Sequence, residues 1–335
     1  MFLTLGIESS CDETSVALLA DDTVLVSETY TQEIHSRFGG VVPEIASRAH
    51  LGKIDRLCSV VLEKAKVEIP ALDLIAVTDG PGLAGALLVG VSFALGLHRG
   101  SGVPVTGVHH LEGHICSILL EPTPPPYPFL ALVVSGGHTA VYLVRSFGTY
   151  EILGQTVDDA AGEAFDKVGK MVGFPYPAGR AIQDEAAKAS STNGVVFPIA
   201  RPGGKGSDFS FSGLKTAVKY HLQSLSEDAR NRQRPSICKA FQNAVIDALC
   251  TGLERAVAST GLTRIAVVGG VACNAPLREK LTTVFGSAVS FPRFANCTDN
   301  AAMIARAGLE RFRTSLTTRP RMDPSRSLGQ GTTEA

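Results

Sequence analysis

The segment HHLEGH places three histidines, His109, His110 and His114, within six residues. His110 and His114 are four residues apart, so a helix that begins near His109 would present both imidazoles on one face. This spacing suits a shared metal ion, for which imidazole is a common ligand. An isolated histidine is more often a core or surface residue. Three so close together, at the end of a predicted strand, favour a metal site.

Glu112 lies between these histidines and raises the alternative of a metalloprotease. In the zinc protease motif the catalytic glutamate directly follows the first histidine, on the same helix as a second histidine four residues on. Here the glutamate comes one position later and would point to another face of the helix. The sequence therefore gives little support to a protease.

Two glycine-rich turns follow apolar strands. In VVSGGHT, residues 133–139, the glycines would let the backbone approach an anion closely, but a tight hairpin would use them equally well. In VVGGVACN, residues 267–274, Gly269 and Gly270 could lie under an adenine or ribose while the Asn274 amide binds the ligand. Asn274 is also a good helix N-cap, and both interpretations stay open.

Two acidic segments could contribute carboxylates. Asp299 and Asn300 open an apolar helix in NCTDNAAMIA, and capping explains one polar group while the other could supply a carboxylate to a metal. The segment DDAAGEAFDKVGK has the composition of a surface helix. Within it only Asp166, if it lies in a cleft, could accept hydrogen bonds from ribose or threonyl hydroxyls.

Strands and helices alternate along the chain, which predicts an α/β layer structure. FLTLGI, SVALLA and TVLVSETY are expected to form an antiparallel meander, and LDLIAVTDGPG, PVTGV and TRIAVVGG are expected to be further strands. FLALVVSGG, TAVYLVRSF and TYEILGQTV predict three strands in a row. The expected helices cover 44–67, 84–97, 159–172, 235–259 and 300–314.

The segment LTLGIESSCDETSVALLA and the segment LALVVSGGHTAVYLVRS share one plan of strand, polar turn and strand. This similarity indicates an internal duplication, with a nucleotide cleft between two lobes. The proline-rich segment EPTPPPYP divides them into residues 1–128 and 129–335. The second lobe is expected to carry a helical insertion near 174–234, and the last helix could pack back on the first lobe.

Composition describes an ordinary globular protein of 335 residues, with 44% hydrophobic and 19% charged residues and a net charge of −1. A nucleic-acid partner would therefore need a local basic surface. Arginines in 306–326 could form a phosphate-binding strip or only a solvated helix face; they are Arg306, Arg311, Arg313, Arg319, Arg321 and Arg326.

Seven scattered cysteines are typical of reduced thiols in the cytoplasm. The first residues resemble neither a secretory signal nor a transit peptide. Apolar runs are too short to span a membrane, so we expect no membrane partner.

Nine segments together carry a family resemblance that covers nearly the whole chain. They are GIESSCDET, GGVVPEIASRAH, DGPGLAGALLVG, HHLEGH, LVVSGGHT, DDAAGEAFDKVGK, DFSFSGLKT, GGVACN and CTDNAAMIA. In this order the chain resembles the bacterial TsaD family, the tRNA N6-adenosine threonylcarbamoyltransferases formerly described as O-sialoglycoprotein endopeptidases. The resemblance implies an actin-like ATPase-domain (ASKHA) fold with two RNase H-like lobes. It also implies transfer of the threonylcarbamoyl group from threonylcarbamoyl-adenylate to N6 of the adenosine 3′ of the anticodon in tRNAs that read ANN codons, with release of AMP.

The resemblance also implies site residues. The metal ligands would be His110, His114 and Asp299, which would hold one divalent ion per subunit, Fe²⁺ in preference to Zn²⁺. The adenylate would lie against Val133, Val134, Ser135, Gly136 and Gly137, and its site would be completed by Asp166, Gly179 and Asn274. Asp12 and Glu13 would line the same cleft, where either could accept the proton that the attacking amine releases. The implied partners are tRNA, TsaB-like and TsaE-like proteins and, as an open possibility, a second copy of the chain.

One segment departs from the family pattern. The family usually has Tyr-Pro-Gly-Gly-Pro where this chain has Tyr176-Pro177-Ala178-Gly179-Arg180. Ala178 restricts the backbone and Arg180 adds a charge near the proposed hydroxyl contacts.

Two other functions share the expected fold. An actin-fold ATPase or kinase would use Mg²⁺, which prefers oxygen ligands, so the clustered histidines count against it. A non-catalytic nucleotide-binding scaffold would not depend on His110 or His114.

Overall fold

Two five-stranded sheets form the framework of the chain. The computed structural model describes residues 1–199 and 206–328. The first sheet has the strand order β3-β2-β1-β4-β5, and the second has the order β10-β9-β6-β7-β8. The strands of the first sheet are β1 (Leu3–Glu8), β2 (Glu13–Ala20), β3 (Thr23–Thr31), β4 (Leu74–Gly80) and β5 (Val105–His109). Those of the second are β6 (Phe129–Val134), β7 (Thr139–Ser146), β8 (Thr149–Gln155), β9 (Ile265–Val268) and β10 (Val289–Ser290).

The two sheets have the same topology. In each, three consecutive strands form an antiparallel meander, β1–β3 or β6–β8. The first strand of each meander then pairs in parallel with a later strand, β4 or β9, which pairs in parallel with β5 or β10. The duplication expected from the two strand–turn–strand segments is therefore present, and the α/β prediction is confirmed.

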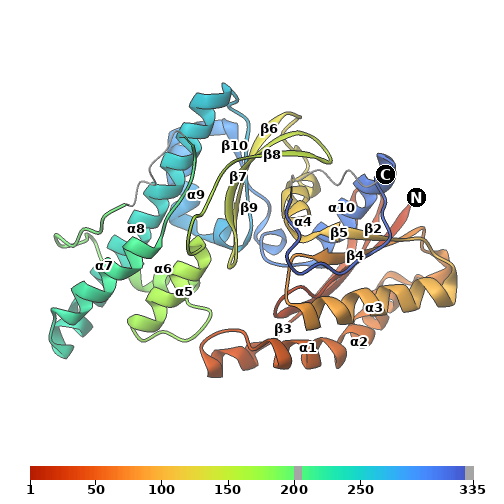
Figure 1. Cartoon of the computed structure of the whole chain (residues 1–335), viewed down its shortest axis with the longest axis horizontal. Coiled ribbons are helices and arrows are strands. Elements are labelled where there is room, and N and C mark those ends of the chain that lie inside the picture. The colour runs from red at the N-terminus through yellow and green to blue at the C-terminus, as the bar shows by residue number, and fades with distance from the viewer. Residues whose placement is uncertain (200–205, 329–335) are drawn as a thin grey trace.

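Helices cover the outer face of each sheet (Figure 1). On the first sheet these are α1 (Pro43–Leu51), α2 (Ile54–Ala65) and α3 (Ala84–Ser101). On the second they are α5 (Ala161–Met171), α6 (Gly179–Ala187), α7 (Ser212–Gln223), α8 (Glu227–Thr260) and α9 (Ala275–Phe285). Short 3₁₀ helices join them at Glu33–Phe38, Ile69–Ala71, Ser117–Leu120, Gly270–Cys273, Gly286–Ala288 and Phe294–Asn296.

The space between the sheets is filled by α4 (His110–Cys116) and α10 (Ala301–Arg313) (Figure 1). Leu111 and Ile115 of α4 pack on the inner face of the second sheet. Met303 and Ile304 of α10 pack with Ala76 and Val108 of the first sheet. The two helices also contact each other, because a Cβ atom on Gly113 would lie 2.6 Å from Ile304 Cδ1. The chain thus returns from the second lobe to the first at α10.

Two predicted helices have other bounds. The single helix expected over 44–67 is divided into α1 and α2 at Gly52, a poor helix former, and α1 contacts α3 whereas α2 contacts β2 and β3. The helix expected from 235 begins at 227, where the Ser226 hydroxyl caps the backbone N–H of Ala229, and it continues through Pro235. The expected insertion near 174–234 contains α6, α7 and the start of α8, and its residues 200–205 lie outside the described part of the chain.

None of the helices in the described ranges combines the length and the apolar character that crossing a bilayer requires.

Candidate metal centre

His110, His114 and Asp299 come together in the layer between the sheets. Each can offer one ligand atom, and these atoms all lie within 4.8 Å of one another. Asp299 Oδ1 is 3.1 Å from His114 Nε2 and 3.6 Å from His110 Nε2. Ligand atoms about 2.0–2.2 Å from one tetrahedral ion are themselves roughly 3 to 4 Å apart, so the three groups fit a shared ion.

His114 gives the clearest indication that the cluster binds a metal ion. Its side chain is fully buried, and neither ring nitrogen has a hydrogen-bond partner among the described residues. The nearby Asp299 oxygen is not aligned with Nε2 as a hydrogen bond. Because unpaired buried nitrogens are costly, a metal ligand is the role that best accounts for this imidazole.

A buried carboxylate orients the second histidine. His110 Nδ1 lies 3.1 Å from Glu8 Oε2 at the end of β1, and Glu8 also accepts hydrogen bonds from the Ser10 backbone N–H and the Thr78 hydroxyl. A carboxylate only accepts, so Nδ1 carries the proton and Nε2 is left for the metal. Burial disfavours the imidazolium, but the carboxylates of Asp299 and Glu8 outweigh it and raise the pKa of His110 to about 9.

The other two polar residues of HHLEGH, His109 and Glu112, have structural partners. His109 Nδ1 accepts the backbone N–H of Leu111 and caps α4, while its Nε2 donates to the Arg326 carbonyl. Glu112 is buried, and its oxygens accept hydrogen bonds from Tyr150 Oη at 2.9 Å and Arg311 Nε at 2.6 Å. With both oxygens engaged, Glu112 ties α4 to β8 and α10 and is not placed as a protease base.

Asp299 is free to bind metal because its neighbour caps the helix. Asn300 Oδ1 accepts the backbone N–H of Met303 at the start of α10. Burial disfavours the charged form of Asp299, but His110 and His114 outweigh it and hold the pKa of its carboxyl well below the usual range. The two polar residues of this segment therefore divide the roles of cap and carboxylate.

Asp12 and Glu13 lie near the metal cluster. Burial raises the pKa of Glu13 well above its ordinary value, and the carboxylates of Asp299 and Asp12 raise it further. The turn is bracketed by His50 of α1, whose Nε2 donates to the Cys11 carbonyl at 2.9 Å. His50 Nδ1 then accepts from the Thr14 hydroxyl at 2.7 Å, so one neutral imidazole fixes both ends of the turn.

The first glycine turn, between β6 and β7, lies close to the two metal-site histidines. Ser135 N–H donates to the His138 carbonyl and closes the hairpin that follows Val133 and Val134. Gly136 and Gly137 at its tip are exposed. His138 is close enough to His110 and His114 that they add to the effect of burial, and the pKa of His138 falls to about 4.

Asn274 and Gly269 have structural partners of their own. Asn274 Oδ1 caps α9 through Leu277 N–H, and its Nδ2 donates to Gln242 at 2.9 Å. Gly269 has φ +96°, and a Cβ there would lie 2.4 Å from the Val134 carbonyl oxygen. Glycine is therefore required at this position for close strand packing, whatever it does toward a ligand.

Asp166 and Gly179 lie at one junction of the second lobe. Asp166 Oδ1 accepts the Ala178 backbone N–H at 2.7 Å, and Gly179 begins α6. Burial raises the pKa of Asp166 to about 6, with a smaller contribution from Asp12. The departure from the family pattern is accommodated here: Ala178 is buried against Gly169, and Arg180 pairs with the exposed Asp184.

The arginine strip suggested by the sequence is largely absorbed by ion pairs. Arg306 and Arg313 pair with Asp22 and Glu310, Arg311 pairs with Glu112, and Arg326 pairs with Asp79. Of the six arginines, Arg319 and Arg321 are left without an ion pair among the described residues.

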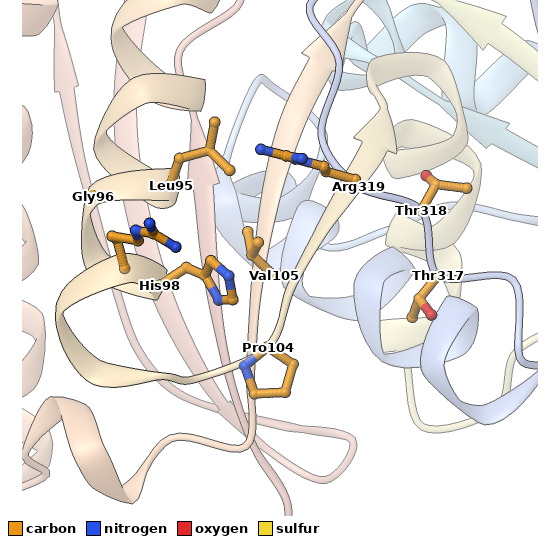
Figure 2. Close-up of a pocket in the computed structure, with 9 residues that line it drawn as sticks. Leu95, Gly96, His98, Pro104, Val105, Thr317, Thr318 and Arg319 are labelled. Carbon is orange, nitrogen blue, oxygen red and sulfur yellow. The ribbon is translucent and has the colours of Figure 1, made fainter.

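One cavity lies away from the metal cluster. It has a volume of about 800 Å³ and is formed where the end of α3 meets β5 and the C-terminal tail. Figure 2 shows Arg319 of the tail reaching toward Leu95 across Val105. Arg319 is the one residue of the predicted arginine strip in the lining, and none of the predicted metal or adenylate residues lines this cavity.

Glu8, Ser10, Thr78 and His50 belong to the site but were not predicted. The signal for Glu8 was a single carboxylate at the end of an otherwise apolar strand, where a buried acid needs partners. His50 is contained in GGVVPEIASRAH, but its partners Cys11 and Thr14 are too distant in sequence to be recognised.

A protein-family model matches most of the chain. The model described as TsaD, tRNA N6-adenosine threonylcarbamoyltransferase, matches residues 23–306. The chain belongs to the TsaD family.

Individual TsaD proteins are similar over most of their length. A tRNA N6-adenosine threonylcarbamoyltransferase from Geotalea uraniireducens (strain Rf4) is 48% identical over 311 residues, which cover 91% of this chain and 90% of that protein. The protein of the same description from Thermodesulfovibrio yellowstonii is 47% identical over 317 residues, 92% of this chain and 94% of that one. The activity of this TsaD chain is therefore threonylcarbamoyl transfer to N6 of adenosine in tRNA.

Solved structures support the two-lobed fold alone. HypF from T. kodakarensis aligns with a TM-score of 0.65 and 12% identity over 96% of this chain and 49% of that chain. The activator of the 2-hydroxyisocaproyl-CoA dehydratase from Clostridium difficile aligns with a TM-score of 0.53 and 13% identity over 94% of this chain and 97% of that chain. These neighbours confirm the ASKHA fold expected for a TsaD protein.

Proposed function

We propose that the chain takes the threonylcarbamoyl group from threonylcarbamoyl-adenylate, attaches it to the adenosine 3′ of the anticodon in tRNAs that read ANN codons, and releases AMP. The observation that carries this proposal is the triad of His110, His114 and Asp299, held between two lobes beside a glycine hairpin and the Asp12–Glu13 turn. Such a donor is a mixed anhydride and already activated, so the site needs no protein nucleophile.

The metal proposed for the triad is Fe²⁺ rather than Zn²⁺, one ion per chain. Two imidazoles and one carboxylate form the donor set that non-haem Fe²⁺ sites use, and Zn²⁺ accepts the same donors. Once bound, a divalent ion would polarise the carbamoyl carbonyl and offset charge on the departing phosphate.

The donor is proposed to lie along the hairpin of Val133, Val134, Ser135, Gly136 and Gly137. Backbone N–H groups at exposed glycines can neutralise phosphate charge without a side chain. The proposed partners on the other side of the adenylate are Asp166, Gly179 and Asn274. The Asn274 Nδ2 group has a second hydrogen beyond the one that it donates to Gln242. It can donate this hydrogen to a ligand while Oδ1 still caps α9.

Asp12 and Glu13 are proposed to receive the proton that the adenosine amine loses after attack. Glu13 suits this role by its place beside Asp299, and its raised pKa strengthens it as a base once it is ionised. His50 holds the turn in place through the Cys11 carbonyl and the Thr14 hydroxyl.

The chain is proposed to work in the cytoplasm with TsaB-like and TsaE-like proteins, and pairing with a second copy of itself stays open. Shared tRNA binding accords with the net charge of −1 and with the internal pairing of the C-terminal arginines. Its working units are proposed to be residues 1–128 and 129–335, with α10 packed on the first.

A reconstitution tests this proposal. The chain is combined with tRNA transcript, ATP, threonine, bicarbonate and an adenylate synthetase, and the nucleosides are analysed by mass spectrometry, with each protein left out in turn. Threonylcarbamoyladenosine should appear only when this chain is present. Its formation without the chain, or its absence from the complete mixture, would overturn the proposal.

A further inference from the structure

The smaller cavity lies at the junction of the two lobes and has a volume of about 300 Å³. The first lobe contributes Ser36 to Gly39, at the end of the 3₁₀ helix after β3. The second contributes Asp166 and Lys170 of α5 and the segment from Phe174 to Tyr176. A cavity of this size suits one small ligand and is too small for a protein element.

The lining combines aromatic rings with unpaired cations. Phe38 is 54% exposed, although it is a large apolar side chain, and Phe174 and Tyr176 are half-buried. Arg37 and Lys170 form no ion pair within the described residues, although Asp166 lines the same cavity. Lys170 reaches toward the other lobe, since a Cβ atom on Gly39 would lie 3.3 Å from its Nζ.

Two residues that line the cavity feel the charge of Asp12, one of the carboxylates proposed to accept the proton. Burial raises the pKa of Tyr176 above its ordinary value, and the next contribution comes from the Asp12 carboxylate. Asp12 likewise influences Asp166 on the opposite wall. The charge of Asp12 therefore acts on two residues that line the cavity.

Rings that stack on a base, with cations for the flanking phosphates, are the features by which proteins bind unpaired nucleotides. The larger cavity, between α3 and the tail, is lined by arginines and His98 but by no Phe or Tyr ring. We propose that the interlobe cavity receives the acceptor adenosine of the tRNA, unstacked from its loop, with Phe38 against the base and Arg37 and Lys170 at the adjacent phosphates. This inference rests on the proposed function and adds a subsite for the acceptor.

An anticodon stem-loop RNA with 2-aminopurine in place of the acceptor adenosine tests the stacking directly. Stacking on an aromatic ring quenches this base, and binding is measured with the assembled enzyme that the reconstitution defines. Wild type should quench the fluorescence. Phe38→Ala should remove the quenching and weaken RNA binding about tenfold, and Lys170→Gln should keep the quenching but lower the slope of log K against log salt by about one.

Two matched controls lie together on α7. Tyr220 is 66% exposed and Lys219 is its exposed neighbour, and neither lines the cavity. Tyr220→Ala and Lys219→Gln should leave both quenching and salt dependence unchanged. In the modification reaction, Phe38→Ala should raise the KM for tRNA about tenfold while the KM for the adenylate stays the same.

Two results would overturn the inference without touching the proposed function. One is wild-type quenching and KM in the Phe38→Ala enzyme. The other is a loss of affinity for a partner protein with RNA binding intact, which would make this surface a protein contact. A wild-type enzyme that modifies no tRNA would instead refute the proposed function, and the quenching assay would still report whether the cavity binds RNA.

Discussion

Within HHLEGH, neighbouring imidazoles have separable roles. Among the described residues His114 has no hydrogen-bond partner, whereas both nitrogens of His109 are used in hydrogen bonds. Loss of a group that only orients a metal ligand weakens binding roughly 10- to 100-fold, so loss of a ligand should exceed that. We therefore expect His114→Ala to reduce Fe²⁺ affinity by more than about a hundredfold, as measured by metal analysis after dialysis against graded chelator.

His109→Asn is the matched control for this variant. Asparagine is a good N-cap, so α4 should form and the metal content should stay at the wild-type value. Equal metal loss in both variants would mean that the motif binds the ion differently from the arrangement described above.

Asp166 should make stability depend on pH. Burial raises its pKa in the folded chain to about 6 from an ordinary value of 3.8, so the folded state binds the proton more tightly than the unfolded state. Its contribution to stability is fully present below the ordinary value and is lost as pH rises toward the folded value. Asp166→Asn keeps an oxygen for the Ala178 N–H and removes the charge. It should be more stable than wild type by up to about 3 kcal/mol near pH 7.5 and indistinguishable near pH 3.

Calorimetric melting of both proteins at the two pH values measures this difference. A stability gain of the same size at both values would show that the Asp166 carboxyl titrates normally.

The sequence predicted individual ligands better than the groups that hold them. The spacing of His110 and His114 indicates a shared ion because helix geometry is local, and capping logic separates Asn300 from Asp299. Glu8 is 102 residues from His110. Only the pairing of β1 beside β5 through β4 brings those two together, and no local pattern encodes it.

At the scale of elements, α10 positions Asp299, the proposed metal carboxylate, by packing closely on the first sheet. A Cβ atom on Gly308 would lie 2.3 Å from Ala76 Cβ, and one on Gly6 would lie 2.1 Å from the Ala301 carbonyl oxygen. Alanine normally stabilises a helix relative to glycine by up to about 1 kcal/mol. Here the sign should reverse, because Gly308→Ala must push α10 off β4, at a cost of about 1–3 kcal/mol.

Gly96→Ala is the matched control in α3, where an added Cβ would meet no atom within 4 Å. It should leave the melting temperature unchanged or raise it slightly, while Gly308→Ala lowers both the melting temperature and the metal affinity. A stabilised Gly308→Ala protein would show that α10 does not press on the sheet.

Element boundaries were predictable where a cap marks them. Asn274 and Asn300 cap helices that begin within a residue of the expected positions. The division of residues 44–67 at Gly52 and the continuation of α8 through Pro235 were missed. At Pro235 tertiary packing overrides the local preference, because α8 runs along a large core, whereas the break at Gly52 follows the low helix propensity of glycine.

At the scale of the whole molecule, the duplicated sheets face each other across α4 and α10. The similarity of the two strand–turn–strand segments predicts this pairing of lobes, because each sheet must bury its inner face against something. The sequence left open whether the last helix returns to the first lobe. Its small residues, Ala301, Ala302 and Ala305, pack there on Ala17 and Leu19 of β2.

The proposed site depends on one ion held by two histidines of α4 and by Asp299, which comes just before α10. Anomalous diffraction at the iron edge, from crystals of the chain loaded with Fe²⁺, locates that ion directly. A single peak should lie between His110 Nε2, His114 Nε2 and the Asp299 carboxylate. Iron bound in stoichiometric amount with its peak elsewhere, or bound without Asp299, would contradict the account.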